Sequence, residues 1–565
     1  MIIEGARVFN VYRRRFEEKS VLVRGGIFVE VGRGLDYPAG EERLDASGAW
    51  LVPGLVDIHM HIESSMTTPS EFSRTVLPFG TTTVVADPHE IANVFGLAGI
   101  KAFMAERTIL DIFYGIPSSV PSTSAALETT GGLIGPEELA ELCQDDRVLC
   151  LGEVMNAKEL LDDGDTRTKL LLERFRRERP FSPIEGHCPA LSGRELSAFI
   201  ASGVWSDHTR QTPESITEKI DAGMFIELQR KSIDEANIGA IVEAGLYEHV
   251  CLVTDDVMPD RLAQGHLNLN VVRAIEAGMR SEDAIYCVTY TPSRHMGLRD
   301  RGAIAPGRKA DFILVDDPES FAIRAVYKNG IAVTPASSRL EHEPSLGFPP
   351  SFYSSIRRKA VSESDFEAHR PISEKEVDCV TIKIDPSSTA TGRGSVRCAV
   401  REGLVQWKEA GLSLLSVIER YGRNAPISLA FVEGGISEDG AIATSWAHDH
   451  HNILVIGRST HDMALAANTL IGEQGGYLVA RGGTVVANAR LPIGGIVSDA
   501  PLASLAADIG EVRKAMCALG YRHADAIMSF STLSLLASPS LKMSDKGLVD
   551  TRTQTVVESY ELPHR

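Results

Sequence analysis

The stretch Asp57-Ile-His-Met-His61 carries two imidazoles at a spacing that can bind a metal ion. Side chains alternate between the two faces of a β-strand, so His59 and His61 would point to the same side of an extended chain. The two rings would then converge on one point. A single His-x-His pair is weak evidence, because such pairs also arise in purely structural settings.

Four more side chains of metal-ligand type follow at the ends of later apolar runs: Glu153, His187, His208 and Asp255. Each of them alone could be a packed core residue, and Asp255 could also cap a helix. Together with the His-x-His pair they make four imidazoles and two carboxylates, which exceeds the ligand set of one tetrahedral ion. The set suits two metal ions bridged by Glu153, an arrangement that activates water for hydrolysis.

Residues so far apart in the chain meet only if the fold brings strand ends together. Short β-branched runs alternate with helical stretches, and eight runs are candidate strands: 55–61, 81–87, 111–116, 148–154, 184–187, 204–208, 224–228 and 250–255. Helix-like intervals include 193–201, 214–222 and 233–244. This order predicts an α/β fold, a (β/α)8 TIM-type barrel, whose C-terminal strand ends surround one pocket.

The two flanks of this barrel also contain strand patterns. Residues 20–31 alternate around a Gly-Gly turn, and residues 325–333 contain an Asn-Gly turn. We expect residues 1–51 and 301–335 to form the two parts of one small β-sandwich domain, with the barrel at 52–300.

A linker and a further domain follow. Residues 334–352 hold four prolines among small and polar residues, which is typical of a linker. Beyond it, strands at 453–456 and 484–487 mix with helices at 462–471 and 502–518. We therefore expect a C-terminal α+β domain over residues 350–565.

Composition narrows the class of partner. The 57 Lys and Arg against 76 Asp and Glu give a formal charge of -19, which repels a phosphate backbone and argues against nucleic acid. The eight cysteines include no C-x-x-C pair, so a zinc ribbon is not expected. The N-terminus lacks the order of a signal peptide, and no uncharged apolar run reaches the roughly 18 residues of a membrane span. We expect a cytoplasmic protein without a membrane partner.

Two longer motifs, Val52-Pro-Gly-Leu-Val-Asp-Ile-His-Met-His61 and Gly302-Ala-Ile-Ala-Pro-Gly-Arg-Lys-Ala-Asp311, resemble signatures of the amidohydrolase superfamily of metal-dependent hydrolases. These two motifs do not separate amidases, cyclic-amide hydrolases and deaminases. Narrower segments resemble the adenine deaminase family within it: 61–65, 86–94, 152–156, 186–193 and 206–208, and in the C-terminal region 447–457 and 491–499.

The resemblance implies hydrolytic deamination of adenine to hypoxanthine and ammonia by a metal-activated hydroxide, in purine salvage. It implies two divalent metal ions, with Mn expected and Fe or Zn as alternatives. Glu153 would bridge the metals where many relatives have a carboxylated lysine, and Asp255 would act as the base, with Asp256 as the next candidate. We also expect adenine as the small-molecule substrate and a homo-oligomer.

His89 and Glu63 follow two of the predicted strands, on the same rim, and are candidates for substrate contacts or proton shuttling. Non-catalytic roles also remain open for both residues, since His89 could shape a turn after Pro88 and Glu63 could be solvated. The cluster His448-Asp449-His450-His451 could be another metal site, ordinary polar packing or a contact near the barrel mouth. We do not place it in the metal centre.

Two other functions remain open at this point. The first is another amidohydrolase that acts on a cyclic amide or N-acyl substrate with the same metals and a different pocket. The second is a non-catalytic binding protein that retains the barrel, against which the six intact ligands argue.

Overall fold

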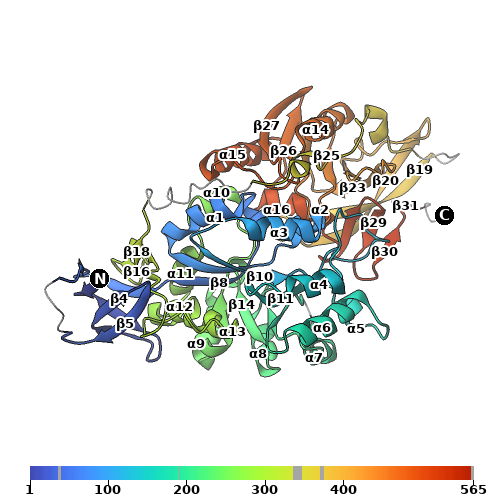
Figure 1. The fold of residues 1–565 in the computed structure, drawn as a ribbon. Coiled ribbons are helices and arrows are strands. Elements are labelled where there is room, and N and C mark those ends of the chain that lie inside the picture. Colours follow the sequence, from blue (N-terminus) through green and yellow to red (C-terminus); the bar gives the residue numbers. More distant parts are fainter. Residues whose placement is uncertain (36–39, 190, 335–346, 370–374, 562–565) are drawn as a thin grey trace.

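The computed structural model describes residues 1–35, 40–189, 191–334, 347–369 and 375–561. Figure 1 shows a β-rich flank near the N-terminus, a central sheet surrounded by helices, and a C-terminal region drawn in yellow to red. No helix in the described ranges is both long enough and apolar enough to cross a bilayer. The predicted linker 334–352 falls largely on residues 335–346, which lie outside the described residues.

The central strands run parallel, and within the described ranges they form one sheet in the order β12-β11-β10-β9-β8 and another in the order β13-β14-β15. Each of the predicted runs in this region contains a strand. Their bounds are β8 Leu55–Met60, β9 Thr81–Ala86, β10 Asp111–Ile116, β11 Val148–Val154, β12 Ile184–Gly186, β13 Ser206–Asp207, β14 Phe225–Leu228 and β15 Val250–Leu252.

Backbone hydrogen bonds join the two sheets at two places, between β8 and the chain after β15 and between β12 and the chain before β13. The parallel strands therefore curl around a common centre. At the first place Asp255 N donates to His59 O at 3.0 Å, and at the second Trp205 N donates to Ile184 O at 3.4 Å. The strand expected over 250–255 ends at Leu252, because Asp255 has a left-handed backbone with φ 58° that an extended strand does not contain.

Helices follow the strands and begin at recognisable caps. α8 (Pro213–Asp221) starts behind Thr212, whose side chain accepts from Ser215 N, and proline occupies its first turn. α9 (Glu235–Ala244) ends at Gly245, whose φ of 67° suits a helix C-terminus. The other helices of this region are α1 Pro69–Val76, α2 His89–Phe95, α3 Leu97–Ala105, α4 Pro136–Leu142, α5 Ala157–Leu161, α6 Arg167–Glu178, α7 Gly193–Ala201, α10 Pro259–Leu262, α11 Leu267–Glu276, α12 Ser281–Cys287 and α13 Tyr290–His295.

The β-rich flank is built from both sides of the central region in the sequence. One sheet has the order β5-β4-β1-β6 and the other β18-β17-β16-β7-β2-β3, in which β16 pairs antiparallel with β7. Ile3, Val23, Leu51 and Phe312 share a hydrophobic cluster between these sheets. The strands are β1 Ile2–Glu4, β2 Arg7–Asn10, β3 Arg15–Glu18, β4 Ser20–Arg24, β5 Ile27–Gly32, β6 Arg43–Asp45, β7 Trp50–Pro53, β16 Phe312–Val315, β17 Ile323–Lys328 and β18 Ile331–Ala332.

The C-terminal region combines a large, mostly antiparallel sheet with the helices α14 (Thr460–Glu473), α15 (Leu502–Ala518) and α16 (Ala526–Ser531). The sheet order is β21-β20-β19-β23-β22-β25-β24-β26-β27, and β31 pairs with β19. Its strands are β19 Glu376–Ile384, β20 Thr391–Arg401, β21 Leu404–Val405, β22 Ser413–Ile418, β23 Ser428–Glu433, β24 Ala441–Thr444, β25 Ile453–Gly457, β26 Gly476–Arg481, β27 Thr484–Arg490 and β31 Tyr560–Glu561. A smaller sheet holds β28 Leu541–Ser544, β29 Gly547–Asp550 and β30 Thr555–Val557.

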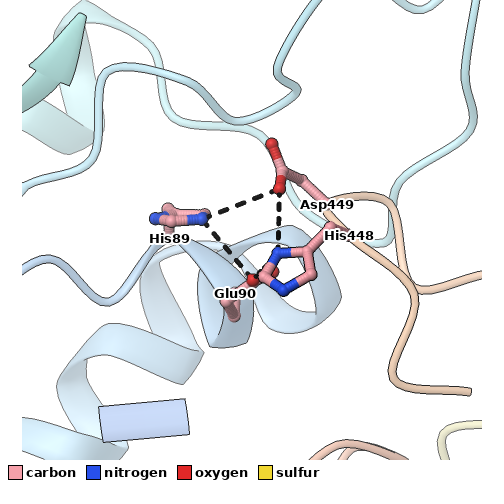
Figure 2. A group of neighbouring side chains, drawn as sticks. All are labelled: His89, Glu90, His448 and Asp449. Carbon is pink, nitrogen blue, oxygen red and sulfur yellow. Dashed lines mark ion pairs between the residues drawn. The ribbon is translucent and has the colours of Figure 1, made fainter. Parts of the chain in front are cut away.

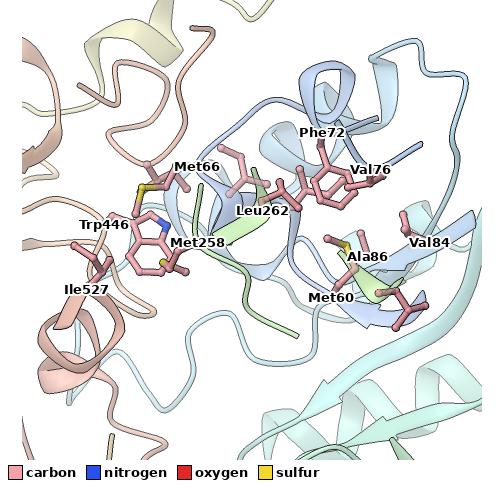
Figure 3. Packing of buried hydrophobic residues seen from close by; sticks show 14 of the residues in the cluster. Met60, Met66, Phe72, Val76, Val84, Ala86, Met258, Leu262, Trp446 and Ile527 are labelled. Carbon is pink, nitrogen blue, oxygen red and sulfur yellow. The ribbon is translucent and has the colours of Figure 1, made fainter. Parts of the chain in front are cut away.

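One hydrophobic cluster runs from the central sheet into the C-terminal region. Trp446 is fully buried and belongs to the same cluster as Met66, Met258 and Ile527, as Figure 3 shows. Its indole Nε1 donates to Glu63 O at 3.2 Å. The C-terminal region is therefore packed onto the carboxyl ends of the central strands through buried hydrophobic side chains.

Candidate metal centre

The six predicted ligands all lie at or just beyond the C-terminal ends of central strands. His59 is on β8 and Glu153 on β11, while His61, His187, His208 and Asp255 come within three residues after a strand end. Their side chains are buried, except that the His187 side chain keeps 24% of its surface exposed. Parallel strands present these ends on one side of the sheet, which brings residues from distant parts of the chain together.

Glu153 is the carboxylate around which three of the histidines gather. Its Oε1 lies 3.5 Å from His61 Nε2. Its Oε2 lies 2.9 Å from His187 Nδ1 and 3.2 Å from His208 Nε2. The two oxygens of one carboxylate thus face two different sets of imidazoles.

Asp255 lies on the side of His59 and His61. Its Oδ1 is 3.4 Å from His61 Nε2 and 3.8 Å from His59 Nε2. The rings of His59 and His208 stack with centroids 3.7 Å apart, which connects this side to the histidines around Glu153 Oε2. The structure therefore brings all six predicted side chains into one group.

The donor set fits two metal ions. Two groups, His59-His61-Glu153 and Glu153-His187-His208, each have ligand atoms within 4.8 Å of one another, and they share Glu153. His59 Nε2 is buried and makes no hydrogen bond, although a buried polar atom ordinarily has a partner. His61 Nδ1 lies 2.9 Å from Asp87 O, which leaves its Nε2 lone pair facing the two carboxylates.

Electrostatics place Glu153 and His59 in the protonation states that ligands need. Burial lowers the pKa values of His61 and His208, but the neighbouring carboxylates outweigh it: Asp255 and Glu153 raise the pKa of His61 to about 10, and Glu153 raises that of His208. Burial raises the pKa of Glu153, but the neighbouring His208 and His187 lower it further, so the carboxyl pKa lies well below its usual range. Burial together with the nearby His208 lowers the pKa of His59 to about 3, so its ring is neutral near pH 7. An ionised carboxylate and a neutral imidazole are the forms that bind metal.

Backbone and side-chain hydrogen bonds hold the ligands in place. Glu153 N donates to Asp87 Oδ2 at 2.9 Å, and Ser118 Oγ donates to Glu153 O at 2.6 Å. Gln229 Nε2 donates to His208 O at 2.8 Å. These contacts fix the strand ends from which the ligands extend, and such supporting contacts tune the affinity of a metal site.

The other two predicted site residues take different positions. His89 begins α2, and its Nδ1 lies 3.8 Å from Glu153 Oε1, at the edge of the group. Glu63 lies in the 3-10 turn Ile62–Ser65, and its Oε1 accepts from Ile91 N at 3.0 Å. Glu63 therefore contacts the helix that carries His89, and it is not one of the described residues that line the cavity.

A cavity of about 260 Å³ opens over the metal-ligand group. His61, Glu153 and Asp255 form part of its wall. The opposite wall comes from the C-terminal region and includes Thr389, Asp449, Met528 and Leu535. The site is thus lined by both regions. A contact of the His448–His451 cluster near the barrel mouth was one of the alternatives left open by the sequence, and the rest of this wall was not predicted.

Sequence reasoning missed two buried acidic residues beside the predicted ligands. Glu227 is fully buried, makes no hydrogen bond and places Oε2 3.9 Å from His59 Nδ1, on the far side of that ring. The sequence feature that could have revealed Glu227 is its position as an acidic residue inside the apolar run 224–228. Glu90 is the second: it meets His448 and Asp449 of the C-terminal region beside His89. The structure thus places the His448–His451 cluster against the central region.

Comparison with known proteins agrees with this geometry. Residues 50–333 match the amidohydrolase family, and residues 388–555 match the adenine deaminase C-terminal domain. Together the two matches cover the region that carries the metal ligands and the region that forms the opposite wall.

Full-length relatives are also similar. A protein of Lactobacillus delbrueckii subsp. bulgaricus named adenine deaminase is 46% identical over 563 residues, covering 99% of each chain. One of Clostridium perfringens with the same name is 47% identical over 566 residues, also covering 99% of each chain. Among solved structures, an enamidase of the amidohydrolase superfamily covers 62% of this chain and 97% of its own, with 17% identity and a TM-score of 0.47.

Proposed function

Because the chain belongs to the adenine deaminase family of metal-dependent amidohydrolases, it hydrolyses adenine to hypoxanthine, and we propose that a two-metal centre around Glu153 performs this reaction. The observation that supports the proposal is the sharing of one carboxylate between two groups of imidazoles. A carboxylate whose two oxygens face different imidazoles can bind one ion on each side.

The proposal includes a closed (β/α)8 barrel beneath the site and a β-sandwich from the two flanks. The bridge between Met60 and Asp255 joins β8 to the chain after β15, which supports closure of the curled sheet. A closed barrel would hold the strand ends at fixed separations. The ligands would then be positioned before substrate arrives.

His59, His61, Glu153, His187, His208 and Asp255 would hold two divalent metal ions, Mn in our proposal and Fe or Zn as alternatives. Bound there, the ions would polarise a water molecule and lower its pKa toward neutrality. Asp255 is the group we assign to take the proton of that water. Burial raises its pKa, but the hydrogen bond with His61 lowers it further, so the carboxylate is ionised and able to accept.

The protein side of the reaction also needs proton transfer to the purine. Water oxygen adds at C6, a proton reaches N1, and the amino group leaves as ammonia after it is protonated. His89 lines the cavity with Nδ1 facing Glu153, and we propose that it contacts substrate or carries a proton. Glu63 would act through the helix, as a positioning residue for His89.

Substrate selectivity tests the assignment. We expect the free base adenine to be deaminated in strong preference to adenosine, because the full-length relatives that are 46 and 47% identical to this chain are named adenine deaminase. Ammonia release is measured from adenine, adenosine, guanine and cytosine at equal concentration, with Mn, Fe or Zn supplied, and with a cyclic amide as a further substrate. Comparable turnover of adenosine, or hydrolysis of the cyclic amide alone, would contradict the assignment.

A further inference from the structure

A second group of potential ligands lies next to the first, between the central and C-terminal regions. His89 and Glu90 are on the first turn of α2, and His448 and Asp449 are on the loop that follows β24, as Figure 2 shows. His89 Nε2 lies 3.6 Å from Glu90 Oε1 and 3.8 Å from Asp449 Oδ1. His448 Nδ1 lies 3.4 Å from Asp449 Oδ1 and also contacts Glu90 Oε1.

These four side chains are buried and incompletely bonded. All keep 4% or less of their surface exposed, Asp449 Oδ2 makes no hydrogen bond, and Glu90 Oε1 faces the imidazoles of His448 and His89. The other oxygen of Glu90 contacts His451 Nε2, which turns Oε1 toward the group. Two buried carboxylates need a compensating charge, because an unpaired buried carboxylate is very costly.

We propose that His89, Glu90, His448 and Asp449 form a further metal site, distinct from the centre around Glu153. One atom from each residue lies within 4.8 Å of the others. Three neighbouring separations of 3.4 to 3.8 Å are close to the edges of about 3.4 Å of a tetrahedron around an ion bound at about 2.1 Å, while His448 Nδ1 and Glu90 Oε1 are in direct contact and would move apart around an ion. One divalent cation would balance the charges of Glu90 and Asp449.

The donor types indicate the metal. Two imidazoles and two carboxylates suit a first-row divalent ion such as Zn or Mn, and four protein ligands complete the coordination expected of a structural zinc site. Two ligands come from each region of the molecule. The ion would therefore pin α2 to the C-terminal region and close the cavity wall that contains His89 and Asp449.

The site also has a consequence for His89. Ligation through Nε2 leaves the ring proton on Nδ1, the nitrogen that lies 3.8 Å from Glu153 Oε1. His89 would then face the first centre as a hydrogen-bond donor. The alternative is a network without metal, in which protonated histidines balance the two carboxylates, and the experiment must separate these two cases.

Metal counting separates them. The full chain is produced with Mn or Zn in the medium, desalted, and analysed for metal per chain. We expect one ion more than the two held around Glu153, and we expect His448→Ala and Asp449→Asn each to lose that ion alone. The control is His461→Ala, which changes a histidine of the C-terminal region whose side chain is 62% exposed, and it should keep the full metal content.

Anomalous diffraction from the unmodified protein provides a second measurement that does not depend on folding of the variants. Data at the Mn or Zn absorption edge should place a peak among His89, Glu90, His448 and Asp449. Two ions per chain with no peak at this position would overturn the proposal and leave the hydrogen-bonded network. That result would not affect the proposed centre around Glu153, because its metal ions would give separate peaks in the same data.

Discussion

Glu153 has a different chemical task from the histidines that surround it. One of its oxygens faces His61 and the other faces His187 and His208, so it can bind on two sides at once. A neutral amide of the same shape cannot offer two anionic oxygens. In the proposed two-metal centre, the charge of Glu153 therefore matters more than its size.

From this we predict that Glu153→Gln lowers the metal content around this residue by at least one ion per chain and removes most of the deaminase activity. Elemental analysis after desalting, together with ammonia release from adenine, measures both effects. Glu173→Gln, on the exposed face of α6, serves as the control. Unchanged metal content and rate in Glu153→Gln would exclude the bridging role.

Asp255 has a left-handed backbone and points its carboxylate at His61 and His59. We predict that Asp255→Asn lowers kcat by about 100-fold to 10,000-fold, which is the range of general base catalysis, with further loss if metal is released. Steady-state kinetics with adenine, checked by circular dichroism for an intact fold, measures this. If the variant turns over at a near-normal rate, the role moves to Asp256, which also lines the cavity.

Residue type and spacing were enough to predict that Glu153 and five other side chains lie together, because all six follow or end parallel strands whose carboxyl ends meet on one side of the sheet. Glu90 could not be recognised in this way. An acid in the first turn of a helix commonly stabilises the helix N-terminus, and nothing in the local sequence distinguishes that role from ligation. Glu90 becomes a candidate ligand only through its contacts with His448 and His451, which lie more than 350 positions later in the sequence.

At the scale of elements, the strands of the central sheet were predictable because their β-branched runs are short, apolar and regularly spaced. The strand at 148–154 and the helices at 193–201 and 502–518 have the predicted bounds. Strand ends were less predictable. The chain from Val253 to Asp255 keeps an apolar-to-polar pattern typical of a strand, but the turn at Asp255 depends on the contact of its backbone with His59.

The element that connects the two regions most directly is the segment between β24 and β25, through Trp446. We predict that Trp446→Ala destabilises the protein by about 3 to 5 kcal/mol, because it removes a large buried side chain and leaves a cavity. Thermal unfolding at a fixed scan rate measures the change. Trp205→Ala is the matched control, since Trp205 is 57% exposed and its loss should cost less than about 0.5 kcal/mol. Equal shifts in both variants would contradict a packed interface here.

At the scale of the whole molecule, the sequence predicted which regions exist but not how they dock. Periodicity reports which face of an element is buried, and it does not report which other element buries it. The wall of the cavity formed by Thr389, Met528 and Leu535 lies in a region whose own pattern only suggested mixed strands and helices. Trp446 and Met66 belong to one hydrophobic cluster across that boundary. The sequence around either residue does not indicate that the other is its neighbour.

The position of these groups along the chain also orders their assembly during protein synthesis. Glu153 and the five predicted ligands around it all precede residue 256, whereas His448 and Asp449 follow nearly 200 residues later. At the roughly 5 to 20 residues added per second by a ribosome, the first group leaves the ribosome about 10 to 40 s before the second. The central region therefore leaves the ribosome with all six candidate ligands while the region that forms the opposite wall of the cavity is still being translated.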